Sequence, residues 1–246
     1  MLFDTHAHYY AEAFDPDRDA VLSALPAAGV GLVLCPGCDL DTSRQSIQLA
    51  EAQLAALFER RMAAVDWLDQ VAEMTRHPKV KAIGEIGLDY YWKEVPRDLQ
   101  KEVFRAQLQL AKVLDLPVIV HDREAHADCL AIVREFPGVR GVFHCYSGSA
   151  EDAKTLVKLG WHLSFTGTIT FKNARKAPEV IAAVPLERIM VETDAPYMAP
   201  TPFRGKRCDS RYVYRMAETI AEIKGLTPAE VEQATTENGK ALFAIP

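Results

Sequence analysis

Six side chains of metal-binding type stand at the ends of apolar stretches in this 246-residue sequence. They are His6, His8, Glu85, His121, His144 and Asp194. Neutral imidazoles and carboxylates are common ligands of divalent ions in proteins. Taken singly, each residue has an ordinary explanation as a core histidine, a loop carboxylate or a helix cap. Together they offer more donors than one tetrahedral ion needs, so they predict a centre with two divalent ions, either Mg²⁺, Mn²⁺ or Zn²⁺.

The overall charge restricts what such a centre could act on. The formal net charge is -6, which argues against a protein that wraps long duplex nucleic acid through a continuous basic surface. An anionic ligand must therefore be attracted locally. Two carboxylates offset only half the charge of two divalent ions, so the remaining positive charge could draw a phosphate into the site.

The elements that would position these residues alternate between apolar strand patterns and longer helical patterns. Strands are predicted at 2–6, 30–34, 61–65, 79–85, 117–121, 139–144, 161–166 and 188–194. Helices are predicted at 17–28, 41–57, from 66 onward, and at 97–114, 125–136, 150–159, 173–184, 210–224, 228–235 and 238–243. Eight strands that each precede a helix predict an α/β fold, a single (β/α)8 TIM barrel over residues 1–246. In such a barrel the six residues meet at the C-terminal rim, where active sites lie.

Other features exclude several classes of protein. No Gly-x-Gly-x-x-Gly follows a strand, which removes the main dinucleotide-binding alternative. No leader segment and no apolar run near 18 residues is present, so we expect a soluble, cytoplasmic protein. The five cysteines are scattered and odd in number, which argues against a disulfide framework. The Cys35-Pro36-Gly37-Cys38 segment follows a strand directly, and we interpret it as a tight turn rather than a redox or zinc site.

Seven segments of the chain resemble the TatD-type metal-dependent hydrolases, often described as deoxyribonucleases, of the amidohydrolase-like superfamily. They are Phe-Asp-Thr-His-Ala-His at 3–8, Gly-Glu-Ile-Gly-Leu-Asp-Tyr at 84–90, Val-Ile-Val-His-Asp-Arg-Glu-Ala at 118–125, Phe-His-Cys-Tyr-Ser-Gly at 143–148, Glu-Thr-Asp-Ala-Pro at 192–196, Arg-Gly-Lys at 204–206 and Thr-Glu-Asn-Gly-Lys-Ala-Leu-Phe at 236–243. The resemblance covers nearly the whole chain. It implies hydrolysis of phosphodiesters at the 3′ ends of single-stranded DNA by a metal-activated water. From the sequence as a whole we expect no membrane association and no obligate protein partner.

The resemblance also implies roles for individual residues. One ion would be held by His6, His8 and Asp194, the other by His121 and His144, with Glu85 as the bridge. Asp194 would also act as general base. Among residues outside this centre, Arg123 and Arg204 are candidates for phosphate contacts, and Tyr90 with its neighbour Tyr91 for stacking on a terminal base. Solvated loop charges and plain packing are the alternatives for these four.

Two segments depart from the family pattern. Relatives carry a longer segment after the third strand, with a Gly-x-His-Pro-His turn, whereas here the predicted strand 61–65 enters the helix at Asp66 directly. We expect either a deleted loop or, more in keeping with barrel geometry, residues missing from the sequence between Val65 and Asp66. The other departure is Arg207-Cys208-Asp209-Ser210, where the family has Asn followed by an acidic residue and Pro.

Two other functions are compatible with the same centre. An amidohydrolase or deacylase, for example one that removes aminoacyl groups from tRNA, would use the same ions on a carbonyl carbon. A binding protein that kept the ions and lost turnover would fit a real deletion of the loop after Val65. Incubation with oligonucleotide, ester and amide substrates discriminates among these functions.

Overall fold

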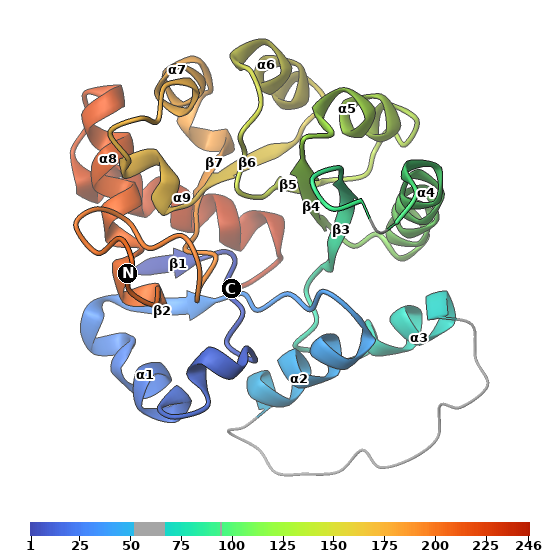
Figure 1. Cartoon of the computed structure of the whole chain (residues 1–246), viewed down its shortest axis with the longest axis horizontal. Coiled ribbons are helices and arrows are strands. Elements are labelled where there is room, and N and C mark those ends of the chain that lie inside the picture. The colour runs from blue at the N-terminus through green and yellow to red at the C-terminus, as the bar shows by residue number, and fades with distance from the viewer. Residues whose placement is uncertain (52–66, 94) are drawn as a thin grey trace.

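Parallel strands arranged in a ring, with helices around the outside, form the body of the protein (Figure 1). The computed structural model describes residues 1–51, 67–93 and 95–246. In this part of the chain the strands are β1 (Leu2–Asp4), β2 (Val30–Val33), β3 (Ile83–Asp89), β4 (Val118–Arg123), β5 (Gly141–Phe143), β6 (His162–Phe165) and β7 (Ile189–Val191). The predicted strand 61–65 and the expected break between Val65 and Asp66 lie outside the described residues.

The strands pair in sequence order, which is the topology of an α/β barrel and confirms the predicted fold class. β1 pairs with β2, and the second sheet runs β3-β4-β5-β6-β7, with every pairing parallel. The first and last strands also meet, because the Thr5 N–H donates to the Val191 carbonyl at 3.2 Å. Asp4 strengthens this junction by accepting from the N–H and the hydroxyl of Thr193 at 2.9 and 2.6 Å.

The helices cover the outer faces of the strands (Figure 1). They are α1 (Arg18–Ala24), α2 (Leu40–Glu51), α3 (Trp67–Met74), α4 (Arg97–Leu114), α5 (His126–Arg134), α6 (Ala150–Lys158), α7 (Lys176–Ala183), α8 (Tyr214–Lys224) and α9 (Pro228–Leu242). On α4 the buried residues are Phe104, Leu108 and Ala111, whose spacing of four and three places them on one helical face. None of the helices in the described ranges is both long and apolar enough to cross a membrane.

A small apolar cluster joins residues of four strands to the end of α9. Its buried members are Phe3, Ile119, Val142, Met190, Leu242 and Phe243. Side chains two apart on a strand share a face, so His121 and His144 lie on the same face as Ile119 and Val142. Each of these two strands therefore carries a buried cluster residue and, two positions later, a histidine of the predicted centre.

The bounds of several predicted elements differ from the structure, and the two clearest differences each involve an element that contains a glycine. The C-terminal helix does not break near residue 236: α9 runs on through Gly239, where a Cβ would come 2.6 Å from the Phe3 ring. This glycine allows α9 to pack closely on β1. Similarly, β3 covers Ile83–Asp89 rather than 79–85, because Gly87 adopts φ +136° and lets the strand continue. Glu85 consequently lies within the strand rather than at its end.

Replacing Gly87 by alanine is expected to destabilise the fold. A Cβ at this position would lie 2.1 Å from the His121 carbonyl oxygen, and the φ of +136° strains any other residue. We expect a loss of about 3 kcal/mol in the free energy of unfolding, measured by urea denaturation. Gly138→Ala is the matched control, because φ is +91° there but nothing lies within 4 Å of the added Cβ. An equal decrease in the free energy of unfolding for the two variants would contradict a clash between the added Cβ and the His121 carbonyl.

Candidate metal centre

One group of donors forms where β1 and β7 end. The His6 and His8 Nε2 atoms lie 3.1 Å apart. Asp194 Oδ1 lies 3.8 Å from His6 Nε2 and 3.2 Å from His8 Nε2. Asp194 follows β7 with φ +57°, a left-handed conformation that aspartate tolerates better than most residues. We call His6, His8 and Asp194 the first donor set.

A second group forms on the neighbouring strands β4 and β5. His121 Nδ1 and His144 Nε2 lie 3.1 Å apart. His144 directly follows β5, while His121 lies within β4 and is 29% exposed. We call these two histidines the second donor set.

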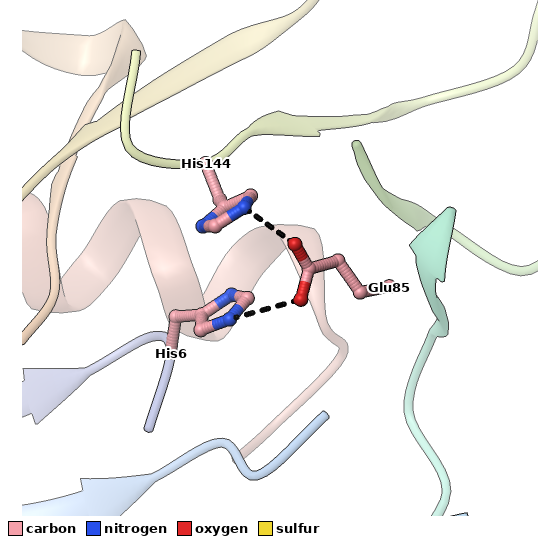
Figure 2. Close-up of side chains that lie close together, drawn as sticks. All are labelled: His6, Glu85 and His144. Atoms are coloured by element: carbon pink, nitrogen blue, oxygen red, sulfur yellow. Dashed lines mark ion pairs between the residues drawn. The ribbon is translucent and has the colours of Figure 1, made fainter. Parts of the chain in front are cut away.

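Glu85 lies between the two sets and presents one carboxylate oxygen to each (Figure 2). Its Oε1 lies 2.6 Å from His121 Nδ1 and 2.7 Å from His144 Nε2. Its Oε2 lies 3.6 Å from His6 Nε2 and 4.0 Å from His8 Nε2. The structure therefore brings all six predicted residues together, although they span 189 positions of the sequence.

The first donor set has the spacing of ligands around one divalent ion. Two ligand atoms about 2.0–2.2 Å from a tetrahedral ion are about 3.3–3.6 Å apart, and the atoms of His6, His8 and Asp194 are 3.1, 3.2 and 3.8 Å apart. Glu85 Oε1 lies only 2.6 and 2.7 Å from the nitrogens of His121 and His144, so these atoms must move apart to hold an ion. His6 Nδ1 and His144 Nδ1 are buried without a hydrogen-bond partner among the described residues. The nitrogen and oxygen donors suit Zn²⁺ or Mn²⁺, and the carboxylates also suit Mg²⁺.

Three surrounding side chains that sequence reasoning missed contact these ligands. Asp89 Oδ2 lies 3.0 Å from His121 Nε2, so it can accept the proton there and turn Nδ1 toward Glu85. Tyr10 Oη lies 2.8 Å from His8 Nδ1. Glu192 Oε1 lies 3.4 Å from His144 Nδ1, too long and poorly aligned for a hydrogen bond, so we regard this contact as electrostatic only.

One sequence signal could have found Asp89. It lies four residues after Glu85 on the same strand, so the two side chains share a face. Tyr10 and Glu192 carried no comparable signal, because their contacts depend on how separate strands and loops meet.

The carboxylates of the centre are held in their ionised form. Burial alone would raise the pKa of Glu85, but the charge of His144 and hydrogen bonds from the surrounding histidines outweigh it and hold this pKa well below its usual range. Burial likewise opposes ionisation of Asp194, and the hydrogen bond with His8 overcomes it and lowers the pKa. Both side chains are therefore available as anionic ligands at neutral pH.

The histidines differ in how strongly they hold a proton. Burial and the charge of His144 lower the pKa of His6. Burial also acts to lower the pKa of His8, but the hydrogen bond with Asp194 outweighs it and raises the pKa to about 11. The Glu85 carboxylate similarly overcomes burial at His121 and His144 and raises both pKa values.

Metal binding is therefore expected to release protons, because imidazoles must be neutral to act as ligands. The raised pKa values of His8, His121 and His144 mean that a proton competes with the ion, so metal affinity should rise with pH across the neutral range. Calorimetric titration with Zn²⁺ in buffers of different ionisation enthalpy measures the released protons. Identical apparent enthalpies in all buffers would contradict this expectation.

Removal of the Tyr10 hydroxyl is expected to weaken metal binding. The Tyr10→Phe variant loses the 2.8 Å contact with His8 Nδ1, which orients Nε2 toward the centre. Loss of a hydrogen bond to the ring nitrogen of a histidine ligand that does not bind the ion lowers metal affinity by about 10-fold or more. Competition with a chelator measures the dissociation constant, and Tyr214→Phe on α8 is the control. An unchanged constant in Tyr10→Phe would rule out the orienting role.

The predicted substrate contacts occupy different surroundings. Arg123 and Arg204 are exposed and lie 4.0 Å above the rings of Tyr91 and Phe171, and within the described ranges neither is paired with a carboxylate. Tyr90 is 8% exposed, and its hydroxyl donates to Asp128 at 2.5 Å. Its neighbour Tyr91 is 48% exposed, so Tyr91 presents the accessible ring.

Another histidine and two cysteines have contacts that bear on the site. His126 Nδ1 lies 2.8 Å from Asp122 Oδ2. Cys35 and Cys38 are both free thiols. Cys38 Sγ lies 3.7 Å from Glu85 Oε2, a contact that the interpretation of this segment as a turn did not anticipate.

Comparison with known proteins places this centre in a family. A model of the family described as TatD related DNase matches residues 3–244. The uncharacterized metal-dependent hydrolase YabD of Bacillus subtilis is 43% identical over 254 residues, which cover 100% of both chains. The alignment is longer than this 246-residue chain, so it contains gaps on this side.

Two Escherichia coli proteins support the same assignment. The uncharacterized metal-dependent hydrolase YcfH is 35% identical over 255 residues, covering 100% of this chain and 96% of its own. The crystal structure of the TatD homologue YjjV superposes with a TM-score of 0.87 at 32% identity, covering 100% of this chain and 98% of that one. The chain therefore belongs to the TatD related DNase family and is a metal-dependent hydrolase.

Proposed function

We propose that the chain is a two-metal phosphodiesterase that removes nucleotides from the 3′ ends of single-stranded DNA, with residues 1–246 acting as one catalytic domain. The observation that carries the proposal is the position of Glu85, whose two oxygens each face a separate set of nitrogen and oxygen donors. A bridging carboxylate between two such sets is the arrangement that two-metal phosphoryl chemistry uses. The family description, TatD related DNase, supports a nucleic-acid substrate.

The first donor set would hold one divalent ion, the second donor set would hold another, and Glu85 would contact both. When bound, two divalent ions supply Lewis acidity and positive charge for the attacking and leaving oxygens of a phosphodiester. The protein supplies the anionic ligands and fixes their geometry by burial: the Glu85 and Asp194 side chains are each 12% exposed.

Asp194 is the proposed general base. Its Oδ1 faces His6 and His8, which leaves Oδ2 to accept a proton from the attacking water. Its lowered pKa keeps the carboxylate ionised and ready to accept that proton at neutral pH.

Arg123 and Arg204 are the proposed phosphate contacts, because a guanidinium fork matches phosphate oxygens and both groups are exposed. A pocket of about 330 Å³ lies beside the centre and is lined by Glu85, His121 and Trp92 among others. Trp92 is 59% exposed, so Trp92 and Tyr91 offer rings on which a terminal base can stack. The buried Tyr90 would support Tyr91 rather than stack itself.

Single-stranded oligonucleotides labelled at either end test this function. With Mn²⁺ or Mg²⁺, we expect a 5′-labelled strand to shorten stepwise, a 3′-labelled strand to release labelled mononucleotide first, and duplex ends to react more slowly. Asp194→Asn should slow the shortening by about 10³-fold, because it removes the proposed base. Intact oligonucleotide together with turnover of an aminoacyl ester or amide would overturn the proposal in favour of a deacylase.

A further inference from the structure

We propose that Cys38 is an additional ligand of the ion held by the first donor set and that this sulfur makes the position selective for zinc. The inference rests on the proposed metal centre but not on its substrate. Cys38 follows β2 in the loop before α2, and its side chain is exposed at the rim.

The distances match those of a shared ion. Ligand atoms of His8, Cys38 and Glu85 all lie within 4.8 Å of one another. The Cys38 Sγ atom is 3.7 Å from Glu85 Oε2, the oxygen that faces the first donor set. A sulfur about 2.3 Å and an oxygen about 2.0 Å from one tetrahedral ion are about 3.5 Å apart. No rearrangement of the loop is therefore needed for Sγ and Oε2 to bind the same ion.

The hydrogen bonds around Tyr10 independently favour a sulfur that accepts. If His8 binds through Nε2, its Nδ1 keeps the proton and donates it to Tyr10 Oη at 2.8 Å. The single hydroxyl proton of Tyr10 is then free to point at Cys38 Sγ, 3.2 Å away. In this arrangement Tyr10 donates to Sγ, and this hydrogen bond can persist when Sγ is bonded to an ion.

The loop backbone fixes Cys38 above β3. The N–H groups of Cys38 and Asp39 both donate to Thr42 Oγ1 at 2.9 Å, which ties the loop to the start of α2. On the other side, the Glu85 N–H donates to the Gly37 carbonyl at 2.8 Å. These main-chain hydrogen bonds therefore fix the distance between Cys38 and Glu85.

The chemical consequence concerns the choice of metal. On binding, the Cys38 thiol releases its proton to solvent and Sγ forms a bond to the ion. Thiolate is a soft ligand that zinc accepts well, whereas Mg²⁺ prefers oxygen. Cys38 adds one protein ligand on the side of His8 and Glu85, the two residues with which it groups, while the second donor set with Glu85 offers three ligands. A site with three protein ligands keeps positions open, so the substrate would approach on the side of His121 and His144.

Cobalt substitution tests the proposal without an activity assay. With Co²⁺ bound, the full-length protein should show the intense near-ultraviolet absorption of a thiolate bonded to cobalt, and Cys38→Ser and Cys38→Ala should lose it. Chelator competition should show zinc affinity about 10–100-fold lower in both variants, with little change for Mg²⁺. Cys35→Ala is the matched control, because Cys35 lies in the same loop but its thiol contacts Ser46; it should keep the absorption.

Metal content distinguishes the possible failures. A wild-type protein that binds cobalt but lacks thiolate absorption overturns the role of Cys38 and leaves the six-residue centre intact. Absorption that persists in Cys38→Ser likewise overturns it. Cobalt absorption that depends on Cys38 can also occur in a protein that does not shorten oligonucleotides. That result supports Cys38 as a ligand and contradicts only the proposal that DNA is the substrate.

Discussion

Glutamine at position 85 is expected to lower the rate of hydrolysis by about a thousandfold or more and to leave fewer than two bound ions per chain. Oε1 of Glu85 contacts both histidines of the second donor set, and Oε2 faces His6. The amide in Glu85→Gln preserves the shape but carries no charge and has only one oxygen. One donor set must therefore face a nitrogen that cannot act as a ligand, and a loss of several kcal/mol in transition-state stabilisation corresponds to such a factor.

Steady-state rates on a single-stranded oligonucleotide and elemental analysis measure these two effects. Glu151→Gln, an exposed position in the first turn of α6, is the matched control and should behave like the wild type. A Glu85→Gln protein with two ions and more than a tenth of the wild-type rate would show that this carboxylate does not bridge the two donor sets.

Asparagine at position 194 is expected to reduce kcat by about 10³-fold with a smaller change in KM. Asp194→Asn keeps an oxygen near His8 but removes the negative charge and the second oxygen, which we propose accepts the proton from the attacking water. Loss of a positioned general base costs about 10²–10⁴ in rate. The substitution also removes the partner that raises the pKa of His8 to about 11, so His8 should titrate at lower pH in the variant.

The rate, the metal content and the titration of His8, followed by NMR, separate the roles of Asp194. Asp115→Asn is the control, because its side chain is 90% exposed and its φ of +51° suits asparagine. If Asp194→Asn loses the ion of the first donor set completely, its defect reflects metal binding alone. An Asp194→Asn protein that keeps this ion and more than a tenth of the wild-type kcat would show that Asp194 is not the general base.

Much of the barrel was predictable because its strands carry strong local signals. The apolar run before His121 is buried on both faces, and this pattern identifies a strand and the end at which its polar residues appear. The bounds of β3 and α9 were less predictable. These bounds depend on Gly87 and Gly239. A glycine can end a helix or strand, or it can allow close packing within one, and the sequence does not distinguish the two cases.

The sequence by itself determined the types and order of the six metal-binding side chains and the barrel rim that gathers them, since strand periodicity and topology are local properties repeated along the chain. Only the tertiary structure decided which oxygen of Glu85 faces which donor set. The tertiary structure likewise decided that Asp89, Tyr10 and Cys38 contact the centre. These relations join side chains from separate strands and loops over a few ångströms, and such distances are set by packing across the whole ring rather than by any local stretch of residues.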